Sequence, residues 1–154
     1  MRAIPLSAGL VLWAVTLHAQ TAKPASATHP AWGPAPAVFP AGAQMAVISG
    51  DPSKAAQFTI ELKMPDGYRI PPHFHPTDEV ATVKQGTFQV GMGDTLDLAK
   101  TKTMKPGDKG TIPAGEHHYA VASGSTIVSV SAMGPFAMTY VNPSDDPTKV
   151  MATP

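Results

Sequence analysis

Short runs of β-branched and aromatic residues, interrupted by glycine, proline or aspartate roughly every ten residues, constrain the fold of this chain more than any other feature. Such spacing is typical of an all-β sandwich or barrel, because turn residues end each run before a helix can form. Seventeen prolines and thirteen glycines in 154 residues agree with this interpretation. We therefore expect a single all-β domain with strands at 45–49, 58–63, 80–84, 87–91, 110–112, 118–122, 126–132 and 137–141.

The details of these strands rest on a few local signals. Residues 126–132 alternate apolar and polar side chains most clearly, which indicates a half-buried strand. Gly86 is expected to turn one strand into the next with a positive φ. A helical turn is predicted only within residues 94–102.

The ends of the chain differ from its centre. Arg2 followed by an apolar run at residues 10–17 is typical of a secretory signal peptide, predicted to span 1–19. That run is too short for a helix across a hydrocarbon core of about 30 Å, so a retained membrane anchor is the weaker interpretation. Residues 20–43 are predicted to be a proline- and alanine-rich linker or covering arm, 44–142 the barrel and 143–154 a tail. We expect a periplasmic or secreted protein.

Charge limits the partners of the chain. Charged residues make up 14% of it and the formal net charge is zero. No basic field is available to attract nucleic acid or an anionic membrane surface. We therefore expect neither nucleic acid nor, after signal cleavage, a membrane as a partner.

The segment around His73 and His75 carries the chemistry. Prolines on both sides block a helix and favour an extended backbone. Side chains two residues apart on a strand point to the same side, so both imidazoles can converge while Phe74 faces the other way. Glu79 shares their parity and is preferred over Asp78 as a carboxylate ligand. Two imidazoles and a carboxylate suit manganese, iron, nickel or zinc as a divalent ion.

A second element supplies a candidate fourth ligand, His118, and makes a family resemblance visible. Gly67, His73, His75, Glu79 and Gly86 match the spacing of the first cupin motif. The second motif is matched by Gly107, Pro113, Gly115 and His118, but Ala122 replaces its closing asparagine. The chain thus resembles the cupin superfamily over roughly residues 44–141. The resemblance implies a jelly-roll double-stranded β-barrel that holds one divalent metal ion through His73, His75, Glu79 and His118.

Function is less constrained than fold. Four protein ligands leave two adjacent positions of an octahedral ion open, which is typical of catalytic sites. We expect a metal-dependent enzyme for a small oxygenated organic molecule, with dioxygenase-like oxidation as first choice and Glu79 as ligand and proton acceptor. Cupins also include isomerases, lyases and decarboxylases, so the fold does not select the reaction. A non-catalytic metal or small-ligand sensor is the alternative, and a structural or storage protein is a third.

Other conspicuous residues receive structural interpretations. His117 is expected to point away from the metal as a surface or interface residue. Phe74 and Tyr119 are expected to pack on the outer face. The methionines at 92, 104, 133 and 138 are interpreted as core filler or protomer contacts, not as a copper site. Apolar outer positions and the resemblance to small cupins favour a homodimer.

Overall fold

The computed structural model describes residues 30–150. The predicted signal peptide, the first part of the predicted linker and the last four residues lie outside the described residues. No helix among the described residues is long and apolar enough to cross a membrane.

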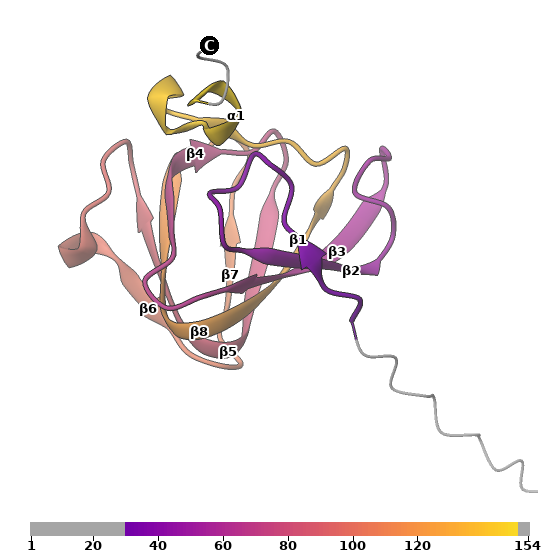
Figure 1. The fold of residues 1–154 in the computed structure, drawn as a ribbon, viewed down its shortest axis with the longest axis horizontal. Helices are drawn as coiled ribbons and strands as arrows, with labels where there is room; N and C mark the ends of the chain where they lie inside the picture. The colour runs from indigo at the N-terminus through magenta and orange to yellow at the C-terminus, as the bar shows by residue number, and fades with distance from the viewer. Residues whose placement is uncertain (1–29, 151–154) are drawn as a thin grey trace, which may run out of the picture.

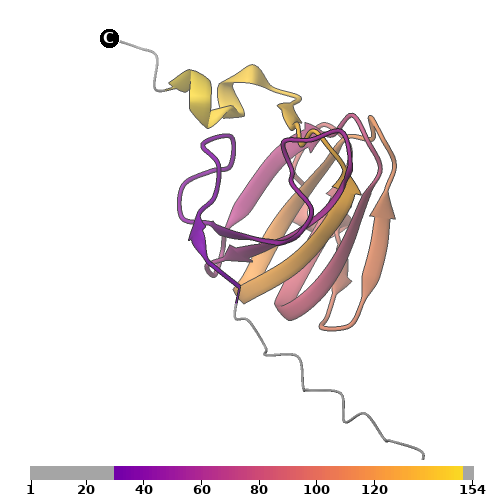
Figure 2. The ribbon, with the colours of Figure 1, turned by 90° about the vertical axis from the view of Figure 1, so that its right-hand side faces the viewer.

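The strands form one antiparallel sheet that curls around a common interior (Figures 1 and 2). The prediction of an all-β fold is thereby confirmed. In chain order the strands are β1 (Gly33–Pro34), β2 (Gln44–Ser49), β3 (Gln57–Met64), β4 (Arg69–Phe74), β5 (Glu79–Met92), β6 (Lys102–Met104), β7 (Lys109–Ile112), β8 (His118–Met133) and β9 (Thr139–Tyr140). Short helical turns are η1 (Leu98–Lys100), η2 (Pro143–Asp145) and α1 (Pro147–Val150).

The long strands β5 and β8 hold the barrel together. β8 pairs with β3 through its C-terminal half, with β4 through its N-terminal end and with β5 along most of its length. β5 in turn pairs with β7 near its start and with β6 near its end. Because β5 and β8 each pair along both of their edges, they link all the other strands into one continuous curled sheet.

Alternation along the strands builds the core. On β3, Phe58, Ile60, Leu62 and Met64 are buried and the residues between them are partly exposed. The C-terminal half of β8 buries Thr126, Val128 and Val130 in the same way, so the alternation predicted there is confirmed. The inward face of the barrel is therefore apolar, and every polar group on it requires a separate explanation.

The prediction that Gly86 ends one strand and begins another is wrong. Residues 80–84 and 87–91 belong to the single strand β5, and the register with β8 shifts on both sides of Gln85. Gly86 has the expected positive φ, 75°, but it serves a β-bulge. A bulge bends a strand without ending it. Opposite this bulge, Gly124 at φ 71° lets the predicted strands 118–122 and 126–132 continue as β8.

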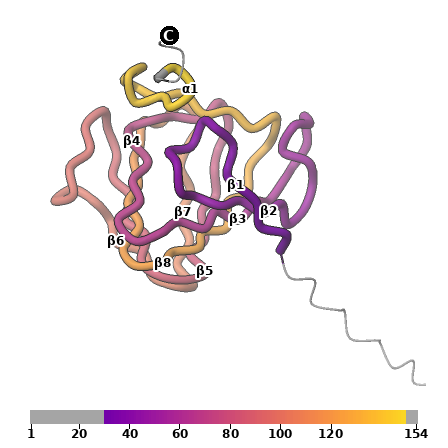
Figure 3. The backbone as a smooth tube through the Cα atoms, viewed as in Figure 1, coloured from indigo at the N-terminus to yellow at the C-terminus, as the bar shows by residue number. Residues whose placement is uncertain are grey.

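The segments flanking the barrel pack against it. Residues 35–43, here called the arm, lead from β1 to β2 (Figure 3). Its residues Phe39 and Ala43 are buried in the core. The helical turn predicted within 94–102 is confirmed as η1, where the Asp97 side chain accepts a hydrogen bond from the Ala99 N–H. The last predicted strand shrinks to Thr139–Tyr140, and η2 and α1 follow it.

Candidate metal centre

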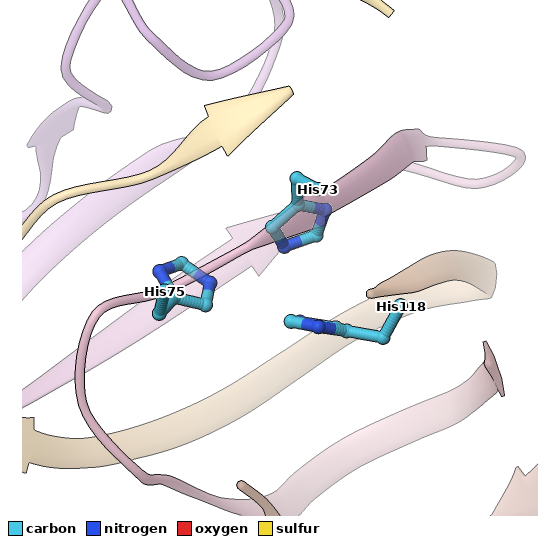
Figure 4. A group of neighbouring side chains, drawn as sticks. All are labelled: His73, His75 and His118. Carbon is cyan, nitrogen blue, oxygen red and sulfur yellow. The ribbon is translucent and has the colours of Figure 1, made fainter. Parts of the chain in front are cut away.

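Three histidines meet in the barrel interior. His73 lies in β4, His75 follows the end of that strand, and His118 begins β8. His73 and His118 face each other in the β4–β8 register. Each side chain offers a ring nitrogen, and these nitrogens all lie within 4.8 Å of one another (Figure 4). The three residues could therefore hold a metal ion.

The prolines predicted to keep this segment extended also shape β4. Pro71 and Pro72 have no N–H to donate, and the register with β8 shifts between Ile70 and His73. The Pro71 carbonyl turns instead to the His73 ring, with 2.7 Å between its oxygen and Nδ1. The local break in the ladder thus positions the first histidine.

Each imidazole is oriented by a backbone carbonyl. The Nδ1 atoms of His73, His75 and His118 lie 2.7, 2.8 and 3.0 Å from the carbonyl oxygens of Pro71, Ala137 and Glu116, in that order. A carbonyl only accepts hydrogen bonds, so each Nδ1 must carry the proton. In a neutral ring Nε2 is then the atom with a free lone pair. Such outer partners are typical of metal-binding histidines.

Glu79, the first residue of β5, completes the cluster. Its Oε2 lies 3.6 Å from Nε2 of His75 and 3.7 Å from Nε2 of His118. The carboxylate therefore approaches the same nitrogens that the Nδ1 hydrogen bonds leave free. Glu79 lies near two of the three imidazoles, those of His75 and His118. The group of three mutually close ring nitrogens consists of the histidines alone.

Burial controls the protonation of the cluster. Desolvation lowers the pKa of His73 well below 6.5, and the neighbouring His118 and His75 lower it further. Desolvation also lowers the pKa of His75 and of His118. The same burial raises the pKa of Glu79 above 4.5. The imidazoles are thus held neutral, which is the form that binds a metal ion.

The residues predicted to lie off the site do so. The His117 ring stacks on Phe74, and its Nδ1 lies 2.6 Å from an Asp94 carboxylate oxygen, away from the three buried imidazoles. The Asp78 carboxylate accepts a hydrogen bond from the Ala114 N–H at 2.8 Å. Asp78 is therefore engaged in a turn and Glu79 is the carboxylate that reaches the histidines.

A small cavity adjoins the cluster. Its volume is about 40 Å³. His73, His75, Glu79 and His118 form its polar part. The remaining lining comes from apolar side chains of β3, β4, β5, β7 and β8, together with Phe39 and Phe136.

Comparison with protein families agrees with this architecture. A family model described as a cupin domain matches residues 60–133, which include all four residues of the cluster. The chain belongs to the cupin superfamily. This cupin carries the complete first motif, and the structure brings the histidine of the second motif to it.

Several known proteins are similar to this cupin over part of its length. It is 39% identical over 61 residues to germin-like protein 5-1 of Oryza sativa subsp. japonica, a match that covers 39% of this chain and 28% of the rice protein. The polyketide cyclase RemF from Streptomyces resistomycificus superposes with a TM-score of 0.57 at 23% identity, over 73% of this chain and 80% of that one. An oxalate oxidase superposes with a TM-score of 0.54 at 20% identity, over 78% and 70%. Both structures show the fold alone.

Two features of this cupin's site were not predicted from its sequence. Phe39 and Phe136 line the cavity from segments outside the strands, and the Phe136 ring centroid lies 5.7 Å from that of His75. The Ala137 carbonyl that orients His75 lies 62 residues away along the chain. The sequence feature that could have indicated the role of Phe39 is its presence as an aromatic residue in the proline-rich arm. Nothing in the local sequence marks Ala137, because any residue supplies a carbonyl.

Proposed function

We propose that this protein is an exported cupin enzyme that binds one divalent metal ion through His73, His75, Glu79 and His118. The reaction of first choice is a dioxygenase-like oxidation of a small oxygenated organic molecule. The observation that carries the proposal is that all three Nδ1 atoms are bound to backbone carbonyls, so that the Nε2 lone pairs are left for an ion. Histidines that merely fill a core would also pair a buried N–H, but they would not need to bring three ring nitrogens within 4.8 Å of one another.

The donor set fits a first-row divalent ion. Two nitrogens on one ion lie at most about 4.2 Å apart, because each metal–nitrogen bond is roughly 2.1 Å. The nitrogens here lie within 4.8 Å of one another, so modest ring rotations would bring them into range. Three imidazoles and one carboxylate suit manganese, iron, nickel or zinc better than calcium or magnesium.

Different residues of the site would have different roles in the reaction. A bound ion would supply Lewis acidity or, if it were iron or manganese, a centre that reacts with dioxygen. The backbone carbonyls hold the imidazoles in position, and the apolar walls exclude water from them. Glu79 lies beside His75 and His118, so its carboxylate can accept a proton from a molecule held there.

Elemental analysis after dialysis tests the ligand set. We expect about one divalent ion per chain in the wild type and a sharp loss in His73→Ala and in His75→Ala. His117→Ala is the matched control, because it removes an adjacent imidazole that faces the outside, and it should retain the metal. Equal loss in all three variants would refute the assignment.

Turnover tests the enzymatic part of the proposal. Protein loaded with Fe(II), Mn(II), Ni(II) or Zn(II) is offered catechols, flavonols, diketones and keto acids, with oxygen consumption and product formation as the readouts. We expect one class to be converted, and Glu79→Gln to reduce that conversion. Absence of turnover for every metal and class would count against an enzyme.

A non-catalytic metal or ligand sensor is the second candidate. It is favoured by one observation: the described cavity lining contains no acid or base besides the four residues of the cluster. A melting temperature that rises with a bound small molecule, without turnover, would support this alternative.

Export and dimerisation form separate parts of the proposal. Export is supported by the apolar run at residues 10–17, and N-terminal sequencing of the mature protein tests it. Dimerisation is supported by Val47 and Ile48, which are 48% and 44% exposed on β2. Light scattering that shows a monomer at micromolar concentration would contradict a dimer.

A further inference from the structure

The cavity beside the histidines is lined by one polar cluster and otherwise by apolar side chains. Its polar side chains are the four residues of the proposed metal site, and no described lysine, arginine, serine, threonine, asparagine or glutamine lines it. A second charged or hydroxylated group on a bound molecule would therefore lose its water without gaining a side-chain partner. Such a loss is strongly unfavourable.

The part of the cavity wall formed by Phe39 and Phe136 differs from the strand walls. Apart from His75, the other lining residues lie in β-strands, whose hydrogen-bonded ladders resist movement. Phe39 comes from the arm and Phe136 from the connection between β8 and β9. Their rings stack with centroids 5.8 Å apart and an interplanar angle of 12°. This pair is thus the part of the wall that lies outside the sheet.

Two tyrosines hold the Phe39 backbone from both sides. The Tyr140 hydroxyl donates to the Val38 carbonyl at 2.7 Å, and the Tyr68 hydroxyl donates to the Pro40 carbonyl. Both tyrosine side chains are buried. The residues immediately before and after Phe39 are therefore tied to the barrel, so the depth to which its ring enters the cavity is defined.

We propose that the cavity accepts a small molecule with one metal-binding head and an apolar body, and that Phe39 limits the length of that body. This inference rests on the proposed metal site and adds the substrate class to it. The head group meets the ion held by the histidines and Glu79. The body lies against the aliphatic side chains of the strands and ends at the Phe39 ring. Tyr68 and Tyr140 act as positioning residues for that ring.

Simple carboxylates test both the substrate class and the length limit. They are added to Co(II)-loaded protein, and binding is followed by the visible spectrum of the cobalt and by the melting temperature. Butyrate and β-alanine have nearly the same shape, but β-alanine ends in an ammonium group where butyrate ends in a methyl group. We expect butyrate to bind at least about tenfold more tightly, because the ammonium group would be desolvated among apolar side chains. Equal affinities would overturn the substrate class.

Hexanoate tests the length limit. We expect the wild type to bind it at least about tenfold more weakly than butyrate, and Phe39→Ala to remove most of that difference. Phe39→Leu should have an intermediate effect if the alanine variant does not fold. Trp32→Ala is the matched control: it removes an aromatic ring that lies over Lys63, outside the cavity, and should keep the wild-type preference.

Three outcomes separate the claims. An unchanged discrimination against hexanoate in both Phe39 variants, or its relief in Trp32→Ala, would overturn the role of Phe39 while leaving the metal site intact. Metal-loaded protein that binds none of the carboxylates would overturn the substrate class. Failure to take up Co(II) at all, measured by elemental analysis before any ligand is added, would refute the proposed function itself.

Discussion

Acid sensitivity of the metal-free protein is the prediction that follows most directly from the buried cluster. His73, His75 and His118 have lowered pKa values because burial disfavours their charged forms. In the unfolded chain they take up protons near the ordinary value of 6.5. The unfolded state therefore binds more protons than the folded state below about pH 6.5, and acidification must lower the free energy of unfolding.

The slope of the free energy of unfolding against pH follows from the number of protons that only the unfolded state binds. Each proton that only the unfolded state binds contributes about 1.4 kcal/mol per pH unit, so three histidines give at most about 4 kcal/mol per unit. Glu79 acts in the opposite direction, because its raised pKa lets the folded state take up a proton before the unfolded state does. Where Glu79 titrates, the net slope falls to about 2.7 kcal/mol per unit. The stabilisation from the histidines is present above pH 6.5 and is lost below it.

Urea unfolding of protein treated with a chelator, from about pH 8 to about pH 5.5, measures this slope. We expect a nearly flat free energy of unfolding at the alkaline end and a steep fall below pH 6.5. His73→Gln, which removes the histidine with the most strongly lowered pKa, should reduce the slope by about 1.4 kcal/mol per unit. A free energy that stays constant or rises on acidification would refute the reasoning.

Three further predictions concern single side chains. Gly86→Ala should lower the free energy of unfolding by about 3 kcal/mol in urea titrations, because φ is positive and a Cβ would lie 2.5 Å from the Ser125 carbonyl oxygen. Gly67→Ala, with a similar φ but open space, should cost only about 1 kcal/mol, and equal losses would contradict the steric argument. Tyr68→Phe should cost about 1 kcal/mol by the same assay, because the Pro40 carbonyl loses its donor; no change would show that the bond contributes nothing. Asp78→Ala should leave metal content unchanged while Glu79→Ala lowers it, and the reverse would exchange their roles.

The sequence alone determined the class of fold and the residues of the candidate site. Turn residues between β-rich runs restrict strand length locally, and the prolines beside His73 and His75 impose an extended backbone. The alternation of side chains on such a backbone then places both imidazoles on one side. These are properties of neighbouring residues, so they can be inferred without knowing what lies across the barrel.

Tertiary structure decided how strands continue and how the site is closed. Gly86 was expected to end a strand, but pairing with β8 on both sides of the bulge makes β5 continuous. The carbonyl that orients His75, and the arm that brings Phe39 to the cavity, come from distant parts of the chain. Such contacts form only when the whole barrel folds. The physical reason is that local preferences determine the direction of each side chain, whereas the identity of its partner is set only when remote segments pack together.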